Sequence, residues 1–118
     1  MTERYKPIKI TDKQSGKVYM LDFNRATVKE SINAGLKADK LTDDPFLLYD
    51  LFYWSFMKNH KDEITRDETD KYIDDVFGGV LHFPEGMPER LAQLYIQTFE
   101  TLTDKERKEK NSRLTVEM

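Results

Sequence analysis

The chain contains no cysteine, which excludes a disulfide framework and a thiolate metal site. It has only two histidines, His60 and His82, and they lie on different segments without the carboxylate spacing of a zinc motif. Neither has a serine or cysteine beside it in a nucleophile setting, so we expect both in exposed loops. Gly78-Gly79 lacks the lysine and the Ser/Thr that follow a phosphate-binding loop, and is better read as the end of a helix. These absences indicate a protein that is not an enzyme and holds no cofactor.

An excess of basic charge is lacking too. The chain has 19 Lys and Arg against 22 Asp and Glu, a net charge of −3. A protein that binds nucleic-acid backbones normally carries a basic excess. A mild basic cluster near the N-terminus, without interleaved aromatic residues, does not change this expectation; it comprises Arg4, Lys6, Lys9, Lys13 and Lys17. We therefore expect no nucleic-acid partner.

Long apolar runs are also missing. The richest segment, residues 46–57, is too short to cross a bilayer, which takes roughly 20 apolar residues. The first ten residues, MTERYKPIKI, lack the apolar core of a secretory signal. Absence of cysteine fits a reducing compartment. We expect a cytoplasmic protein that does not bind membranes.

The length of 118 residues favours one domain, residues 1–118. Residues 5–11 and 17–23 alternate apolar with polar side chains, and the polar, glycine-ended segment between them is typical of a hairpin loop. The sequence therefore predicts an N-terminal β-hairpin over residues 5–23. Because a lone hairpin is marginal in water, it must pack against the rest of the chain.

The remainder, residues 24–110, predicts about four helices. Asn24 is a fair N-cap for the first, although Thr27–Glu30 could form the capping box instead; Val28 and Ile32 would share its inner face, and Gly35 would end it. The other helices are expected over residues 45–60, 65–77 and 88–102, begun by Asp43-Asp44-Pro45, by a Thr65–Glu68 capping box and after Pro88. The last could restart in a new direction at residues 103–106, and residues 111–118 are expected to be a flexible tail. The class is α+β, a hairpin packed on a small helical bundle.

One stripe of acidic residues, Asp67, Asp70 and Asp74 with Asp75 beside it, would share a helical face. Hard cations need oxygen ligands around a tight turn, usually with a glycine inside, and that pattern is missing. A solvated acidic face is the better interpretation, and no metal is expected.

The apolar segment, residues 46–57, has two faces when read as a helix. Its core stripe comprises Leu48, Leu51, Phe52, Ser55 and Phe56. The opposite stripe, called the mixed stripe below, comprises Phe46, Asp50, Tyr53, Trp54 and Met57. Aromatic residues and methionine around one acid are the composition that protein interfaces prefer, so these five are the candidate partner-binding residues. The alternative is that the last helix covers this stripe and that Asp50 is paired inside the fold.

Several segments resemble a known family. The run Tyr19–Arg25, then Thr27-Val28-Lys29 and Gly35, and the aromatic run Leu47–Tyr53 are similar to the small tail assembly chaperones of long-tailed phages, particularly phages of Gram-positive hosts. The resemblance covers residues 8–102, and its motifs are patterns rather than catalytic signatures.

This resemblance implies a non-enzymatic protein in the cytoplasm of a bacterial host, encoded by a phage or prophage. Such a protein binds the long, helical, apolar tape measure protein while the tail tube assembles, is absent from the mature virion, and often self-associates; the tail tube protein is a second possible partner. Two alternatives stay open: a structural or head–tail joining protein retained in the virion, and a small regulatory or nucleic-acid-binding protein.

Overall fold

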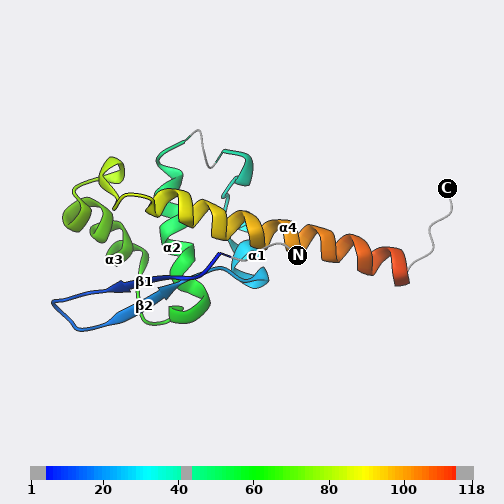
Figure 1. Ribbon diagram of the computed structural model, residues 1–118, viewed down its shortest axis with the longest axis horizontal. Coiled ribbons are helices and arrows are strands. Elements are labelled where there is room, and N and C mark those ends of the chain that lie inside the picture. Colours follow the sequence, from blue (N-terminus) through cyan, green and yellow to red (C-terminus); the bar gives the residue numbers. More distant parts are fainter. Residues whose placement is uncertain (1–4, 41–43, 114–118) are drawn as a thin grey trace.

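A computed structural model describes residues 5–40 and 44–113, with side chains up to residue 100 except at residue 38. It confirms the α+β prediction, with an N-terminal hairpin packed against four α-helices (Figure 1). The elements in order are β1 (Ile8–Thr11), β2 (Val18–Leu21), α1 (Arg25–Asn33), the 3-10 turn η1 (Ala38–Lys40), α2 (Leu47–His60), α3 (Arg66–Lys71), the π-helical turn η2 (Tyr72–Phe77), the 3-10 turn η3 (Val80–His82) and α4 (Met87–Arg113).

The hairpin is antiparallel, with Ile8 opposite Leu21 and Ile10 opposite Tyr19. Its loop is held by Asp12, whose side chain accepts hydrogen bonds from the Gln14 and Ser15 N–H groups. Both strands are shorter than predicted. Pro7 precedes β1, and the chain after β2 turns to α2, where the Asp22 N–H donates to the Ser55 carbonyl.

Local capping chemistry sets the starts of two helices. Asn24 and Thr27 form a reciprocal capping box at α1, so the alternative start at Thr27 is wrong. The inner face of α1 contains Val28, but Ile32 is 40% exposed and Ser31 is buried in its place. The Ser31 hydroxyl lies 2.9 Å from the Tyr95 hydroxyl of α4, which makes a polar residue tolerable there.

The third predicted helix is present in two parts. The Thr65–Glu68 capping box begins α3 as expected. After Lys71 the helix widens into η2, and it ends at Gly78, whose φ of +88° is the left-handed conformation that glycine adopts easily. The Gly79 N–H then donates to the Ile73 carbonyl and closes the turn.

The second predicted helix begins slightly late. Asp44 caps the Phe46 N–H with its side chain, and α2 begins at Leu47; Asp43 lies outside the described residues. The last predicted helix is one continuous α4, so the expected change of direction at residues 103–106 is wrong. No proline or glycine occurs between Pro88 and Arg113 to break it. Of the tail predicted over 111–118, residues 111–113 belong to α4 and the rest lies outside the described residues.

The core lies between the hairpin, α1, α2 and α4. Leu51, Phe52 and Phe56 of the core stripe are fully buried, and Leu48 packs partly buried against them. They meet Tyr19 and Leu21 of β2 and Leu91, Leu94 and Tyr95 of α4. Within residues 5–40 and 44–113, no helix is both long enough and apolar enough to cross a membrane.

Candidate functional site

The mixed stripe of α2 falls into three environments. Phe46, which precedes the first turn, is 68% exposed. Asp50, Tyr53 and Trp54 are half-buried. Met57 is only 7% exposed and belongs to the hydrophobic core, so its assignment to a partner-binding surface is wrong. Met57 lies in the C-terminal half of α2, whose last residues Asn59 and His60 are hydrogen-bonded to Met20 of β2.

Arg66, at the start of α3, organises the middle of the stripe. Its guanidinium contacts the Asp50 carboxylate at 2.8 Å and the Asp70 carboxylate at 2.9 Å, and lies 5.6 Å from the centre of the Tyr53 ring. Burial disfavours the charged guanidinium, but hydrogen bonds to Asp70 and Asp50 outweigh it and raise the pKa of Arg66. Asp50 is thus paired, as the alternative interpretation expected, but its partner is on α3 and the pair is half-exposed.

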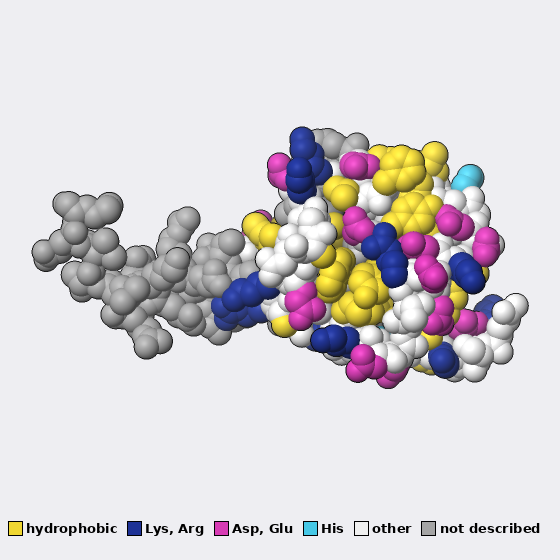
Figure 2. Space-filling model, turned by 180° about the vertical axis from the view of Figure 1, so that it is seen from behind, with side chains coloured by type: hydrophobic (Ala, Val, Ile, Leu, Met, Phe, Trp, Pro, Cys, Tyr) yellow, Lys and Arg dark blue, Asp and Glu magenta, His cyan; other side chains and the backbone are white. Residues whose placement is uncertain are grey.

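Two aromatic contacts complete this surface. The Tyr53 and Trp54 rings meet edge to face with centroids 5.2 Å apart. Tyr49, on the preceding turn, donates a hydrogen bond to Asp74 of η2, and this bond together with burial raises the pKa of Tyr49. We call the partly exposed set Phe46, Tyr53, Trp54 and Arg66 the α2 face. On the side of the molecule seen from behind, hydrophobic side chains gather with basic and acidic side chains between them (Figure 2).

The predicted acidic stripe is only partly solvated. Asp67 and Asp75 are exposed as expected. Asp70 instead pairs with Arg66 one turn earlier in α3, and Asp74 of η2 accepts a hydrogen bond from Tyr49 of α2. Among the described residues, no group of three or more His, Cys, Asp or Glu side chains could hold a metal ion.

The two histidines differ. His82 is exposed in η3, as predicted. His60 is not an exposed loop residue: its Nε2 accepts the Met20 N–H at 3.0 Å, its Nδ1 lies 2.7 Å from Glu63, and its ring packs edge to face on Tyr19. Because Nε2 accepts, Nδ1 carries the proton and donates to Glu63. His60 therefore fastens the end of α2 to β2.

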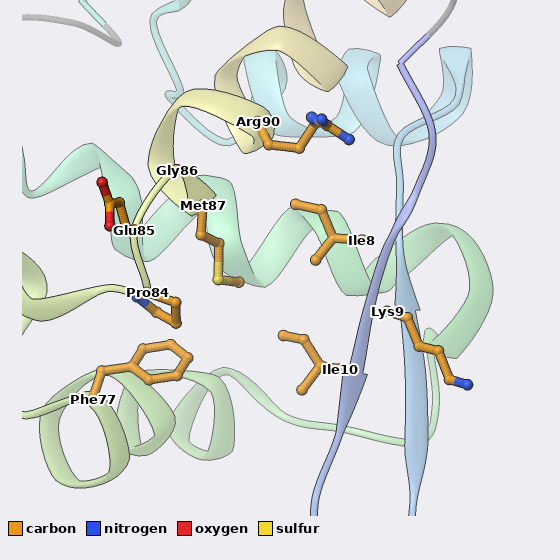
Figure 3. A pocket seen from close by; sticks show the side chains of 9 residues that line it. All are labelled: Ile8, Lys9, Ile10, Phe77, Pro84, Glu85, Gly86, Met87 and Arg90. Atoms are coloured by element: carbon orange, nitrogen blue, oxygen red, sulfur yellow. The ribbon is translucent and has the colours of Figure 1, made fainter.

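A groove of about 550 Å³ runs beside β1 and was missed by the sequence reasoning. Ile8 and Ile10 point into it from the strand, and Phe77, Pro84 and Met87 face them from the opposite wall (Figure 3). Lys9 points away from the groove, and Glu85 and Arg90 lie at its rim. Its walls come from segments about seventy residues apart, which no local pattern could bring together.

Residues 1–118 match the family described as "Domain of unknown function (DUF5055)". The chain belongs to the DUF5055 family. No curated protein and no solved structure gives a significant match. The surfaces of this DUF5055 chain that are open to a partner include the α2 face and the groove beside β1.

Proposed function

We propose that this protein is a non-enzymatic tail assembly chaperone of a long-tailed phage or prophage. It would bind the tape measure protein in the cytoplasm of the bacterial host and support assembly of the tail tube. The support comes from the resemblance of residues 8–102 to such chaperones, together with the physical character of the α2 face.

The observation that carries the proposal is that Arg66 packs over Tyr53, which in turn contacts Trp54, within a partly exposed aromatic surface. Two carboxylates fix the guanidinium, and the guanidinium in turn covers one side of Tyr53. Aromatic and arginine side chains dominate binding energy in protein interfaces. Because Arg66, Tyr53 and Trp54 already contact one another, docking on them costs a partner little side-chain entropy.

The shape suits a helical partner. Phe46, Tyr53 and Trp54 occur along one side of α2 at a spacing that follows the turns of the helix. An apolar helix lying along this side would bury the exposed Phe46 ring and the open edges of the other two rings. The whole chain is 35% charged, which would keep a complex with an apolar partner in solution.

Co-expression with the tape measure protein from the same genome tests the proposal. We expect the two proteins to elute together on size exclusion and the tape measure protein to become more soluble. Phe46→Asp should weaken the complex while leaving the melting temperature close to that of the parent. Trp54→Ala should weaken the complex more than it lowers the melting temperature, because part of the Trp54 side chain packs against the core.

Leu81→Asp is the matched control for Phe46→Asp. Leu81 is also a strongly exposed large apolar residue, at 81%, but it lies in η3 and outside the α2 face. A tape measure protein that neither co-elutes nor gains solubility would refute the chaperone role. Detection of the protein in purified virions would favour a retained structural protein instead.

A further inference from the structure

The two outer edges of the hairpin differ in their hydrogen bonding to the rest of the chain. At the β2 edge, Met20 is satisfied by α2: its N–H donates to His60 and its carbonyl accepts from the Asn59 side chain at 3.0 Å. The next outward N–H on this edge, that of Asp22, donates to Ser55. The β2 edge is therefore closed by the last turns of α2.

The β1 edge is open. The Asp12 N–H donates to the Lys17 carbonyl, and hydrogen-bonded pairs alternate along an antiparallel ladder. Ile8 and Ile10 therefore bond to β2, whereas Lys9 and Thr11 direct their N–H and C=O groups away from it. Within the part of the chain that the structure describes, these outward groups have no hydrogen-bond partner. Such an edge is a template for another strand.

The groove lies along this open edge. An extended segment paired with Lys9 and Thr11 would place every second side chain beside Ile8 and Ile10, facing Phe77 and Met87. The side chains between them would lie on the opposite face, beside the side chains of Lys9 and Thr11. The site thus fits a short strand that is apolar on one face and polar, with an acid opposite Lys9, on the other.

The chain carries such a sequence in residues 114–118, Leu-Thr-Val-Glu-Met. Leu114, Val116 and Met118 alternate with Thr115 and Glu117. We infer that residues 114–118 of a second copy of this chain add to β1 as a third strand. The three apolar side chains fill the groove, and Thr115 and Glu117 pair across the strands with Thr11 and Lys9.

The length of α4 makes this an exchange between copies. The groove lies at the first turn of α4, which contributes Met87 and Arg90, and the helix continues to Arg113. At 1.5 Å per residue, Arg113 is about 40 Å from Met87. Five extended residues reach at most about 17 Å, so they fall short of their own groove. Figure 1 shows α4 extending beyond the other elements, away from the hairpin.

The contact joins two different surfaces of the chain. Reciprocal exchange closes a dimer, whereas sequential exchange gives a ring or a filament. In each case association requires both an open β1 edge and an intact 114–118 sequence. The inference is independent of the tape measure partner proposed above, since it involves only this chain.

Sedimentation equilibrium of the full chain over a wide concentration range tests the inference. We expect the mass to rise above the 14.0 kDa of one chain. Val116→Asp, which puts a charge into the groove, should weaken association about tenfold or more. Thr115→Asp is the matched comparison, because it adds the same charge next to this position but on the face outside the groove, and it should weaken association much less than Val116→Asp does.

A complementation experiment tests the geometry. Thr11→Pro removes one outward N–H without removing a hydrogen bond to β2. It should therefore prevent a strand from adding to the β1 edge, while residues 114–118 stay unchanged. Neither Thr11→Pro nor Val116→Asp should associate alone, but their mixture should form a mixed complex. In that complex the Val116→Asp chain supplies the intact β1 edge, and the Thr11→Pro chain supplies the intact 114–118 segment.

The inference is overturned if the full chain stays at one-chain mass at the highest concentration reached, or if Val116→Asp associates as strongly as Thr115→Asp. A mixture that fails to associate while circular dichroism shows a folded Thr11→Pro also overturns it. If Thr11→Pro is unfolded, the comparison of Val116→Asp with Thr115→Asp decides the matter.

Discussion

Replacement of Arg66 by methionine tests how α3 is joined to the α2 face. Methionine keeps an unbranched apolar side chain but removes the charge and all the N–H donors. The substitution breaks both ion pairs, to Asp50 and Asp70, and removes the cation from the face of the Tyr53 ring. It leaves the capping box at Thr65 in place, so α3 itself should still form.

The expected loss of stability is moderate. Exposed ion pairs contribute roughly 0.2–1 kcal/mol each, and an exposed cation–π contact contributes about 0.5–1 kcal/mol. The Arg66 side chain is 42% exposed, so solvent screening places the sum toward the lower end of these ranges. We expect unfolding to become easier by about 1 kcal/mol, or roughly 4 °C in melting temperature for a domain of this size.

Urea denaturation of a double-mutant cycle measures the coupling directly. The cycle compares the parent, Arg66→Met, Asp50→Asn and the double variant, and we expect a coupling free energy of about 0.5 kcal/mol. Arg90→Met is a useful control, because Arg90 lies at the same distance, 5.6 Å, over the Tyr5 ring but on a different part of the fold. A coupling of zero would show that Arg66 and Asp50 do not pair in solution. If Arg66→Met lowered the free energy of unfolding by more than about 3 kcal/mol, the ion pairs of Arg66 would behave as buried ones, which would contradict the exposure of its side chain.

Three further variants test other contacts. Tyr72→Phe removes the 2.7 Å hydrogen bond to Asp12, and this bond lowers the pKa of Asp12. A carboxyl group whose pKa is lowered in the folded state stabilises the fold at pH values above its unfolded pKa of about 4. Thermal melts should therefore show the parent to be more stable than Tyr72→Phe at neutral pH, and this difference should shrink as the pH falls below about 4. His60→Ala removes the acceptor of the Met20 N–H, and should lower the free energy of unfolding by about 1–2 kcal/mol and speed hydrogen exchange at Met20; unchanged exchange there would contradict the His60 contact. Gly78→Ala meets no atom within 4 Å of the new methyl group, so its cost of about 1 kcal/mol in urea denaturation should come from the φ of +88° alone, and Gly78→Asn should cost less.

Short-range chemistry was predictable from the sequence. The hairpin loop, the capping box at Thr65 and the stop at Gly78 each depend on residues within a few positions of one another. The core stripe of α2 was also predicted, because helical periodicity places Leu51, Phe52 and Phe56 on one side.

Contacts between distant segments were not predictable in the same way. Periodicity tells which side of α2 a residue is on, but not which element covers that side, and so neither the burial of Met57 nor the role of Arg66 could be found. His60 and Met20 are 40 residues apart, and only their packing shows that the histidine closes a strand edge. Arg66 had one local signal, its position four residues before Asp70.

The closure of the β2 edge by α2 has a consequence for the order of folding. Met20 and Asp22 depend on Ser55, Lys58, Asn59 and His60, and a two-stranded hairpin alone is marginal. The strands therefore gain their stability only after the last turns of α2 have formed. During synthesis, the hairpin residues leave the ribosome first, but the hairpin becomes stable only after the chain has been synthesised as far as His60. The hairpin and the end of α2 should then open together as one cooperative unit in native-state hydrogen exchange.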